Sequence, residues 1–411
     1  MKKDVILQNL IKKEIRRQRE TLNLIASENF VSPEILNILS SPLTNKYSEG
    51  YPAKRYYAGN QYYDEIENLT RERALRIFKL NPRVWSVNVQ PYSGSPANLE
   101  IYFALLNFGD TLMGMNLTAG GHLTHGHFAN FSGKAYRVIP YGIDPRSGFL
   151  DYQKLENLAL KHKPKIIVSG ASAYPRKINF QKIGRIAKKI GAYHLADISH
   201  IAGLVAAGLH PSPFAFSEIV MTTTHKTLRG PRAAIIFSKK SLASAIDKAV
   251  FPGIQGGPHN NVIAAIAATF FEAQQPEFKF YQKQVVKNAR VLAAALKKLG
   301  FNLVTGGTDN HLLLIDLKNL GVDGFRAEKK LEAVGIVTNR NPLVGDKNLF
   351  RPSGLRLGTP AVTTAGLKEK EMRQIAEWIY RILVKKESPK FIKKEVGKFC
   401  QKFPLKIYGE N

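Results

Sequence analysis

The heptapeptide Met221-Thr222-Thr223-Thr224-His225-Lys226-Thr227 is the most informative stretch of this chain. It follows a short apolar run, Ile219–Val220, and precedes another, Ala233–Phe237. We therefore expect Lys226 in a polar loop between two buried strands. Burial lowers the pKa of a lysine from its ordinary value of about 10.4, and a neutral amine can form a Schiff base with a carbonyl group. That chemistry is typical of enzymes that use pyridoxal phosphate (PLP).

A lysine by itself is a weak indication. The chain holds 60 Lys and Arg residues against 32 Asp and Glu, and most of these basic side chains must be solvated surface groups. Other positions have to support the assignment of Lys226.

The composition describes a globular chain. Its 411 residues exceed one ordinary core, so two domains are expected. The single cysteine, Cys400, excludes an internal disulfide and fits a reducing, cytoplasmic location. No apolar run approaches the about 18 residues of a membrane span, so we expect no membrane partner.

The net charge of +28 is unusually high. Residues 1–20 have seven Lys and Arg against three acids, and residues 385–406 have eight Lys against two Glu. Such a field favours anionic partners, although solvated faces of a lysine-rich protein explain it equally well. Nucleic acid is therefore a partner that the sequence permits but that we do not expect.

The order of elements predicts an α/β protein. Residues 1–23 form a charged helix, and residues 165–169 and 192–196 form short buried strands on either side of a helix over 181–190. After residue 275 come a helix over 281–299, a strand over 312–317 and a final helix whose apolar positions extend from Met372 to Leu383. We expect an N-terminal helix and arm (1–50), a large PLP-binding α/β domain with a mostly parallel sheet (51–274) and a smaller C-terminal α+β domain (275–411).

Two further motifs suit a phosphate-bearing cofactor. Ser93-Gly94-Ser95-Pro96-Ala97-Asn98 precedes a helix, where backbone N–H groups can bind a phosphate. An ordinary helix cap is the alternative. Asp197 ends a predicted strand and His200 follows it; an aspartate there can pair with a pyridinium nitrogen or simply cap a helix.

Three histidines lie in the segment Gly120–His127. The segment has neither cysteine ligands nor a helical His-x-x-x-His face, so we expect no metal site. An imidazole stacked on a planar ring agrees better with the other motifs.

The chain resembles the serine hydroxymethyltransferase family from about Leu24 into the C-terminal domain. The strings that show this are Leu24–Asn29, Thr44–Pro52, Lys54–Tyr57, Gly121–Gly126, Thr223–Thr227, Gln255–Pro258, Gly307–His311 and Leu355–Pro360. The resemblance implies the PLP-dependent type I fold, tetrahydrofolate as co-substrate and a homodimer or tetramer with shared active sites.

The resemblance also implies roles for individual residues. Lys226 would bind PLP covalently, Asp197 would pair with its ring nitrogen and His122 would stack on the ring. The remaining cofactor contacts would come from Gly94, Ser95, Ser172, His200 and Thr223, with Tyr47 and Gly257 reaching over from the neighbouring subunit. The substrate carboxylate would be held by Ser27 and Arg356. Catalysis would also involve Glu49, Tyr57 and His225, and the folate side would include Leu117, Gly121, Leu123 and Asn341.

The implied reaction is the reversible transfer of the hydroxymethyl group of serine to tetrahydrofolate. The alternative is a folate-independent aldolase that cleaves β-hydroxy amino acids. Several positions depart from the family pattern, among them Ala53, Ala58, Ala233, Ala234 and Ile254, which replace glycines. Their extra carbons are expected to restrict the loop backbone.

Overall fold

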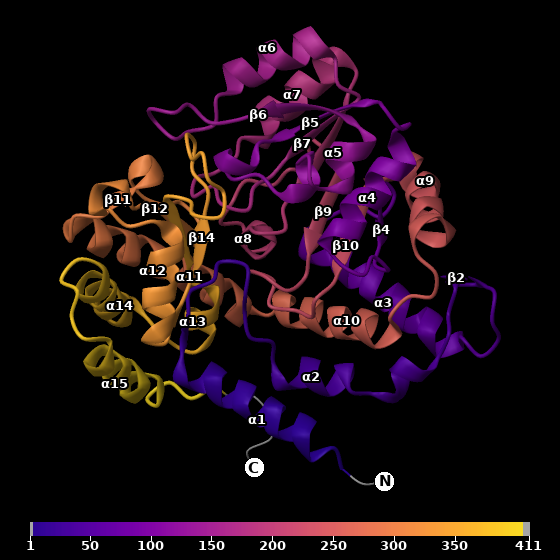
Figure 1. The fold of residues 1–411 in the computed structure, drawn as a ribbon. Coiled ribbons are helices and arrows are strands. Elements are labelled where there is room, and N and C mark those ends of the chain that lie inside the picture. Colours follow the sequence, from indigo (N-terminus) through magenta and orange to yellow (C-terminus); the bar gives the residue numbers. More distant parts are fainter. Residues whose placement is uncertain (1–2, 406–411) are drawn as a thin grey trace. The chain divides into compact units, whose positions relative to one another are not determined.

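The computed structural model describes residues 3–405 and contains two compact units (Figure 1). The large unit is Glu34–Lys283, and the terminal unit combines Met1–Pro33 with Gln284–Asn411. The domain borders expected at residues 50 and 274 stay predictions, while the compact units have their borders at 33 and 283. Each unit is described by itself.

The large unit is built on a seven-stranded sheet with the order β4-β10-β9-β8-β7-β5-β6. Only β10 runs antiparallel to its neighbours, which confirms the predicted mostly parallel α/β fold. The strands are β4 (Trp85–Asn88), β5 (Thr111–Met115), β6 (Arg137–Tyr141), β7 (Ile166–Ser169), β8 (Tyr193–Asp197), β9 (Ile219–Thr223) and β10 (Ala234–Lys239).

These strands form because they are apolar on both faces. In β7, Ile166, Ile167 and Val168 are all fully buried, as expected of parallel strands covered on both sides by helices. The prediction for β9 was too short, because Met221–Thr223 belong to the strand and the polar loop starts at Thr224. These residues pair with Ala234–Ile236 of β10, and backbone pairing outweighs the polar character of the threonines.

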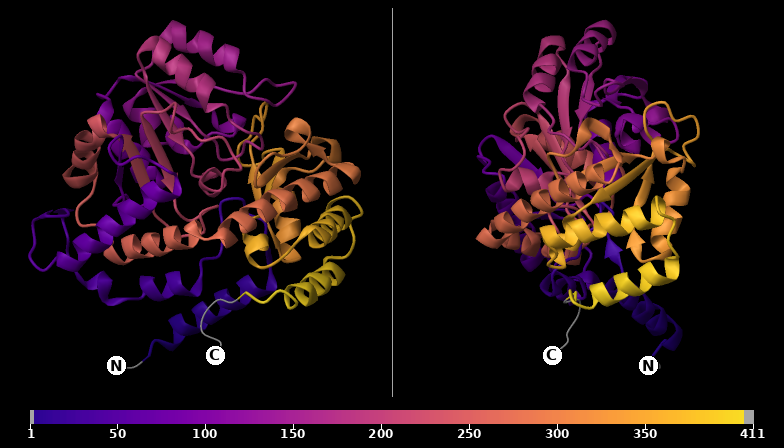
Figure 2. Two further views of the ribbon diagram at one scale, coloured as in Figure 1. Left: turned by 180° about the vertical axis from the view of Figure 1, so that it is seen from behind. Right: turned by 90° about the vertical axis from the view of Figure 1, so that its left-hand side faces the viewer.

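Helices connect the strands and cover the sheet (Figure 2). The predicted helix before β8 is present as α7: the side chain of Asn179 accepts a hydrogen bond from Lys182 N at 3.0 Å, and Gly191 ends the helix with φ +71°. The helices that begin in this part of the chain are α2 (Pro33–Leu39), α3 (Gln61–Ile77), α4 (Gly94–Leu105), α5 (Phe131–Ala135), α6 (Tyr152–His162), α7 (Phe180–Ile190), α8 (Ala202–Ala206), α9 (Ala243–Lys248), α10 (Asn260–Gln274) and α11 (Pro276–Lys298).

The terminal unit contains the predicted α+β arrangement. Its four-stranded antiparallel sheet has the order β11-β12-β15-β14, and a short parallel pair joins β1 to β13. The strands are β1 (Leu22–Asn23), β11 (Asn302–Leu303), β12 (Leu312–Asp316), β13 (Ile336–Val337), β14 (Asn339–Asn341) and β15 (Gly354–Gly358). The helices are α1 (Val5–Glu20), α12 (Gly324–Ala333), α13 (Pro360–Thr364), α14 (Glu369–Leu383) and α15 (Pro389–Cys400), together with most of α11.

The helix that ends at Leu383 is not the final one, which corrects the sequence prediction. Helix α15 follows it and buries Ile392, Val396 and Cys400. Its apolar residues are few and are separated by lysines, so the segment resembles a solvated basic tail until packing shows which face is buried.

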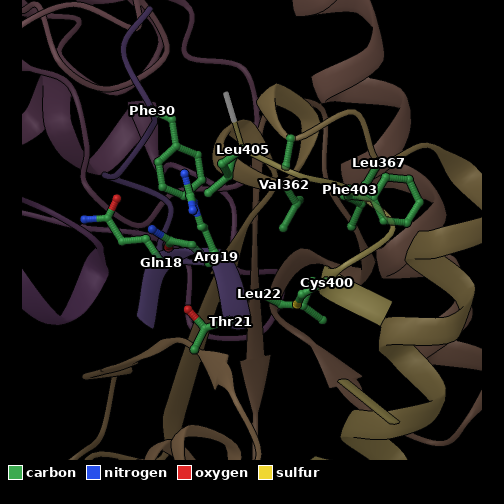
Figure 3. A pocket seen from close by; sticks show the side chains of 12 residues that line it. Gln18, Arg19, Thr21, Leu22, Phe30, Val362, Leu367, Cys400, Phe403 and Leu405 are labelled. Atoms are coloured by element: carbon green, nitrogen blue, oxygen red, sulfur yellow. The ribbon is translucent and has the colours of Figure 1, made fainter. Parts of the chain in front are cut away.

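Cys400 also lines a small cavity in the terminal unit (Figure 3). Its volume is about 20 Å³, which is room for roughly one water molecule. Burial raises the pKa of the Cys400 thiol to about 12, so this cysteine is an unreactive packing residue. Across residues 3–405, no helix has the length and apolar character needed to cross a membrane.

Helix α4 contains a buried acid that the sequence did not single out. Glu100 is completely buried, and neither of its carboxyl oxygens has a hydrogen-bond partner among the described residues. Burial raises its pKa from 4.5 to about 8. Glu100 is therefore mostly neutral at pH 7, because an ionised carboxylate without partners would be very costly here.

Replacing Glu100 with glutamine should make the protein less sensitive to alkaline pH. The unfolded chain ionises this carboxyl group above about pH 4.5, whereas the folded chain does so only near pH 8, so wild-type stability falls across that window. Glu100→Gln lacks this titration. We therefore expect the difference in free energy of unfolding, variant minus wild type, to increase by on the order of a few kcal/mol between about pH 5 and pH 8. Denaturant titration at several pH values measures this difference. A constant difference at all pH values would contradict the assignment.

Candidate active site

A buried carboxylate stands at the carboxyl end of β8. Asp197 is 8% exposed, and its Oδ2 atom lies 3.1 Å from His125 Nε2 and 3.1 Å from Asn98 Nδ2. Its Oδ1 atom accepts a hydrogen bond from Ser199 N at 3.0 Å. The partners come from helix α4, from the loop after β5 and from the turn after β8, so this carboxylate joins three segments.

The surroundings of Asp197 keep it ionised. Burial by itself would raise its pKa, but the hydrogen bond and charge of His125, the charge of Lys226 and the hydrogen bond from Ser199 outweigh burial and hold the pKa well below its usual value. Asp197 is thus a fixed negative charge at neutral pH.

Lys226 follows the neighbouring strand, β9, and is 9% exposed. Strands β8 and β9 are parallel and bring Asp197 into register with Met221. The charges of Lys226 and Asp197 therefore act on one another at the same edge of the sheet. Burial, followed by the charges of Lys226 and Arg232, lowers the pKa of the adjacent His225 to about 3, so its imidazole is neutral at pH 7.

The beginning of helix α4 approaches the same strand. A Cβ atom on Gly94 would lie 2.7 Å from Thr223 Cγ2, which explains a residue without a side chain at this position. The Ser93 side chain makes no capping hydrogen bond and Pro96 has no N–H group, so the alternative of a side-chain cap at Ser93 is wrong. The backbone N–H groups of Gly94 and Ser95 can therefore serve an anion.

The loops after β5, β7 and β8 complete this edge. Ser172 N donates a hydrogen bond to Gly120 O at 2.7 Å, which joins the loop that contains His122 to the loop after β7. Thr227 Oγ1 donates to His200 O at 3.0 Å and joins the loops after β8 and β9. The structure thus brings together at one sheet edge the elements that carry the predicted cofactor residues Gly94, Ser95, His122, Ser172, Asp197, His200, Thr223 and Lys226.

The three histidines of the Gly120–His127 loop have different surroundings. His122 Nδ1 lies 2.8 Å from Thr124 Oγ1, whereas His125 faces Asp197. Within residues 3–405, no group of three His, Cys, Asp or Glu residues is placed to hold a metal ion. The folate-side candidates of this loop differ in exposure: Leu117 is half-buried, Gly121 is buried and Leu123 is exposed.

A second group in the large unit comprises Tyr47, Glu49, Tyr57 and Gly257. The rings of Tyr47 and Tyr57 meet edge to face with their centroids 5.0 Å apart, and a Cβ atom on Gly257 would lie 3.2 Å from Tyr47 Cε1. The charge of Glu49 raises the pKa of Tyr47. The four predicted residues are therefore neighbours within one chain.

Arg55 fixes the backbone of this second group. Its Nη1 atom donates to Ser48 O at 2.9 Å and to Gly50 O at 2.7 Å, and its other nitrogens form ion pairs with Asp64 and Glu67 of α3, each at 2.8 Å. The motif Lys54-Arg55-Tyr56-Tyr57 thus contains a structural arginine beside its exposed tyrosines.

Of the five positions where this chain replaces a family glycine, only Ala53 has a positive φ, at +62°. It lies in the turn between β2 (Gly50–Tyr51) and β3 (Lys54–Arg55) and follows Pro52. This is the turn position that favours glycine, because a Cβ atom is strained in the left-handed region. The expected restriction therefore concerns Ala53, whereas Ala58, Ala233, Ala234 and Ile254 have ordinary backbone angles.

Ala53→Gly should stabilise the protein despite the greater entropy of its unfolded chain. Relief of a strain of roughly 1–2 kcal/mol outweighs the entropic cost of glycine, roughly 0.4–1 kcal/mol, so the free energy of unfolding should rise by up to about 1.5 kcal/mol. Ala58→Gly is the matched control and should lower stability slightly, because Ala58 carries no such strain. Thermal and denaturant unfolding measure both, and equal effects of the two variants would contradict the strain at Ala53.

The terminal unit contains a buried cation on β15. Arg356 is 8% exposed; its Nε atom donates to Asn339 Oδ1 at 3.0 Å, and its Nη2 atom lies 3.4 Å from Ser27 Oγ. Burial lowers its pKa to about 10, partly offset by the charge of Glu28, so the guanidinium is charged at neutral pH. A desolvated planar cation beside a hydroxyl group suits a carboxylate ligand.

Asn341, on the adjacent strand β14, is buried, and its Nδ2 atom donates to Pro342 O at 2.8 Å. The structure thus places the predicted carboxylate-binding pair Ser27 and Arg356 in one unit, with Asn341 on the neighbouring strand.

Sequence reasoning missed the residues that hold Asp197. Asn98 and His125 belong to recognisable motifs, but nothing in the sequence indicates that they meet a carboxylate 99 and 72 residues away. The only signal was their placement in the phosphate motif and in the histidine-rich loop.

A buried lysine, an ionised aspartate and an uncapped helix end at one edge of a mostly parallel sheet define the class of PLP-dependent enzymes of fold type I. The family model described as Serine hydroxymethyltransferase matches residues 1–379. The chain is also 52% identical over 399 residues to the Serine hydroxymethyltransferase of Koribacter versatilis (strain Ellin345), covering 96% of this chain and 93% of that protein. The chain belongs to the serine hydroxymethyltransferase family and is a PLP-dependent transferase.

Proposed function

We propose that this chain catalyses the reversible transfer of the hydroxymethyl group of serine to tetrahydrofolate, giving glycine and 5,10-methylenetetrahydrofolate. The single observation that supports this most strongly is the placement of buried Lys226 and ionised Asp197 after neighbouring parallel strands, at one edge of the sheet. Family membership supports the same reaction.

The residues at that edge fit PLP. The cofactor, when bound, withdraws electrons from the α-carbon of an amino acid. Asp197 supplies a negative charge suited to a protonated ring nitrogen, and the first turn of α4 at Gly94 and Ser95, with Thr223, suits a phosphate. Lys226 would hold the cofactor covalently. The ring contacts that we assign are His122, Ser172 and His200.

His225 contributes by being neutral. Its lowered pKa means that it adds no positive charge beside the amine of Lys226 at pH 7. Because His225 is neutral, the ionisation of Lys226 depends on the charge of Asp197 and on the ligand bound at the site, and not on a charge of His225. This is the role we assign to His225.

The substrate carboxylate is assigned to Arg356 and Ser27. The guanidinium is charged, buried and oriented by Asn339, so a bound carboxylate would offset the cost of burying it. Protons at the serine hydroxyl group and the folate are assigned to Glu49, with Tyr57 beside it. The folate contacts that we assign are Leu117, Gly121, Leu123 and Asn341.

We further propose a homodimer, alone or as half of a tetramer, that works in the cytoplasm. Four tyrosines within residues 47–62 are unusually exposed for aromatic residues: Tyr47 at 55%, Tyr56 at 76%, Tyr57 at 46% and Tyr62 at 67%. Exposed aromatic groups of this kind suit a surface that a second copy covers. The single, buried cysteine fits a reducing compartment.

The proposed reaction predicts that tetrahydrofolate strongly accelerates serine cleavage by the purified, PLP-loaded protein. Glycine formation from serine should be measured with and without tetrahydrofolate. Lys226→Ala should abolish this activity and lose the visible absorption of covalently held cofactor, because it removes the amine to which we assign the covalent link. Its far-ultraviolet circular dichroism is the control for folding.

Two outcomes would contradict the proposal in different ways. Serine cleavage without any response to tetrahydrofolate would indicate a folate-independent aldolase. A wild-type protein that takes up no PLP would show that the site at Lys226 does not bind this cofactor.

Mixed dimers test whether the sites are shared. One chain would carry Gly257→Asp and the other Lys226→Ala; the aspartate would crowd the Tyr47 ring and place a negative charge where we assign the phosphate. If Lys226 of one subunit works with Gly257 of the other, one of the two sites has both native residues and should bind PLP normally. Homodimers of either variant serve as controls and should have no normal site. A mixed dimer without a normal site would contradict sharing.

A further inference from the structure

The excess positive charge of the large unit is concentrated in one segment. Residues 152–190, which include α6, β7 and α7, contain ten Lys and Arg and a single acid, Glu156. The other residues of the large unit contain nineteen Lys and Arg and fifteen acids. A generally lysine-rich composition would spread the excess evenly, so this concentration needs a local explanation.

Nearly all of these charges face solvent, and half of them have no side-chain partner in the described part of the chain. Nine of the ten basic side chains are exposed. Five of them make no hydrogen bond or ion pair with any side chain in residues 3–405: Lys154, Lys161, Lys163, Arg185 and Lys188. Neighbouring like charges repel one another, so this surface carries an electrostatic cost that an anionic ligand would relieve.

A cleft of about 410 Å³ lies between the two helices, which are adjacent at the top of Figure 1. One side is formed by Lys182, Arg185 and Lys189, which follow one another at helical spacing along α7. The α6 side is formed by Tyr152, Gln153 and Glu156.

The basic side chains at the two ends of the cleft contact residues of α6, whereas the one in the middle has no hydrogen bond or ion pair with them. Lys182 Nζ lies 5.2 Å from the centroid of the Tyr152 ring, and Lys189 Nζ lies 2.9 Å from Glu156 Oε1. Arg185 lies between these pairs with its guanidinium available. A planar guanidinium in a basic cleft suits bidentate binding of a phosphate.

Aromatic groups stand among the charges. Phe149, three residues before Tyr152, is 45% exposed, and the Arg176 guanidinium lies 5.5 Å from its ring centroid. Proteins that bind single-stranded nucleic acids stack bases on exposed aromatic rings and contact the phosphates with nearby cations.

We propose that the α6–α7 surface, defined as residues 149–190, binds single-stranded RNA. The basic surface extends well beyond the cleft. A small anion would need only the cleft, whereas a nucleic-acid strand would contact the wider surface. Anchoring in a membrane would require a row of exposed apolar side chains, whereas the exposed positions of α6 and α7 are mostly charged or amide residues. Phosphates would meet Arg185, Lys188 and Lys182, and a base would stack on Phe149.

A charge-reversal experiment tests this surface. The PLP-loaded wild type and the variant Arg185→Glu/Lys188→Glu would be titrated against a fluorescein-labelled single-stranded RNA oligonucleotide at several salt concentrations, with anisotropy as the readout. The variant should bind at least about tenfold more weakly at moderate salt, and two lost phosphate contacts should reduce the salt slope by about 1.4.

The matched control reverses two exposed basic residues at the opposite edge of the sheet. Arg83→Glu/Lys240→Glu changes the net charge by the same amount beside β4, whereas the proposed surface flanks the other half of the sheet. This control should keep its affinity within about threefold. A Phe149→Ala variant should weaken binding without changing the salt slope, because it removes stacking and no charge.

Three results would overturn the proposal: no RNA binding by the wild type, equal losses in the two charge-reversed variants, or binding to vesicles with anionic lipids that depends on Arg185 while RNA does not bind. Serine cleavage measured on the same preparations keeps this test separate from the proposed enzyme function. The Arg185→Glu/Lys188→Glu variant should retain that activity, since neither residue belongs to the catalytic site.

Discussion

The buried negative charge of Asp197 is the constraint on which the rest of the active site depends. Removing a carboxylate from water is costly unless charges and donors replace the solvent. Here Asn98, His125, Ser199 and the charge of Lys226 do so from α4 and from the loops after β5, β8 and β9. Satisfying one carboxylate thus fixes four segments relative to one another, and the same segments carry the groups that we assign to the cofactor.

Two local features away from that carboxylate cost the folded state free energy. Ala53 stands in a turn position that favours glycine, and Glu100 of α4 buries a carboxyl group that has no hydrogen-bond partner among residues 3–405. The two costs are met differently. The backbone strain at Ala53 is offset by neighbouring contacts, such as the hydrogen bond from its N–H group to Asp64. Glu100 avoids the cost of a buried charge by staying protonated. Neither position touches the Asp197 cluster through a hydrogen bond in the described part of the chain.

The high net charge has a different explanation in different places. In α1 several basic side chains form ordinary surface ion pairs, such as Arg16 with Glu20 and Arg17 with Glu14, which contribute little to stability. Over residues 152–190 the cations outnumber the acids ten to one, and three of these cations border the cleft between α6 and α7. The terminal clusters are conspicuous in the sequence, yet the internal segment has the geometry of a binding surface, because two packed helices concentrate charge that a linear count spreads over 39 residues.

The sequence by itself determined the fold class, the family and the identity of Lys226, Asp197 and Arg356 as residues of interest, because hydrophobic periodicity and short motifs are local properties. It placed β7, β8 and α7 within a residue or two, and it failed at β9 and α15, where pairing and packing outweigh a polar or lysine-rich composition. Only the tertiary structure showed that His125 and Asn98 hold Asp197, that Ala53 is the one residue with a positive φ among the five that replace glycines, and that the carboxyl group of Glu100 has no hydrogen-bond partner within residues 3–405. Those facts depend on contacts between distant segments or on a single backbone angle, and neither is written in the order of the residues.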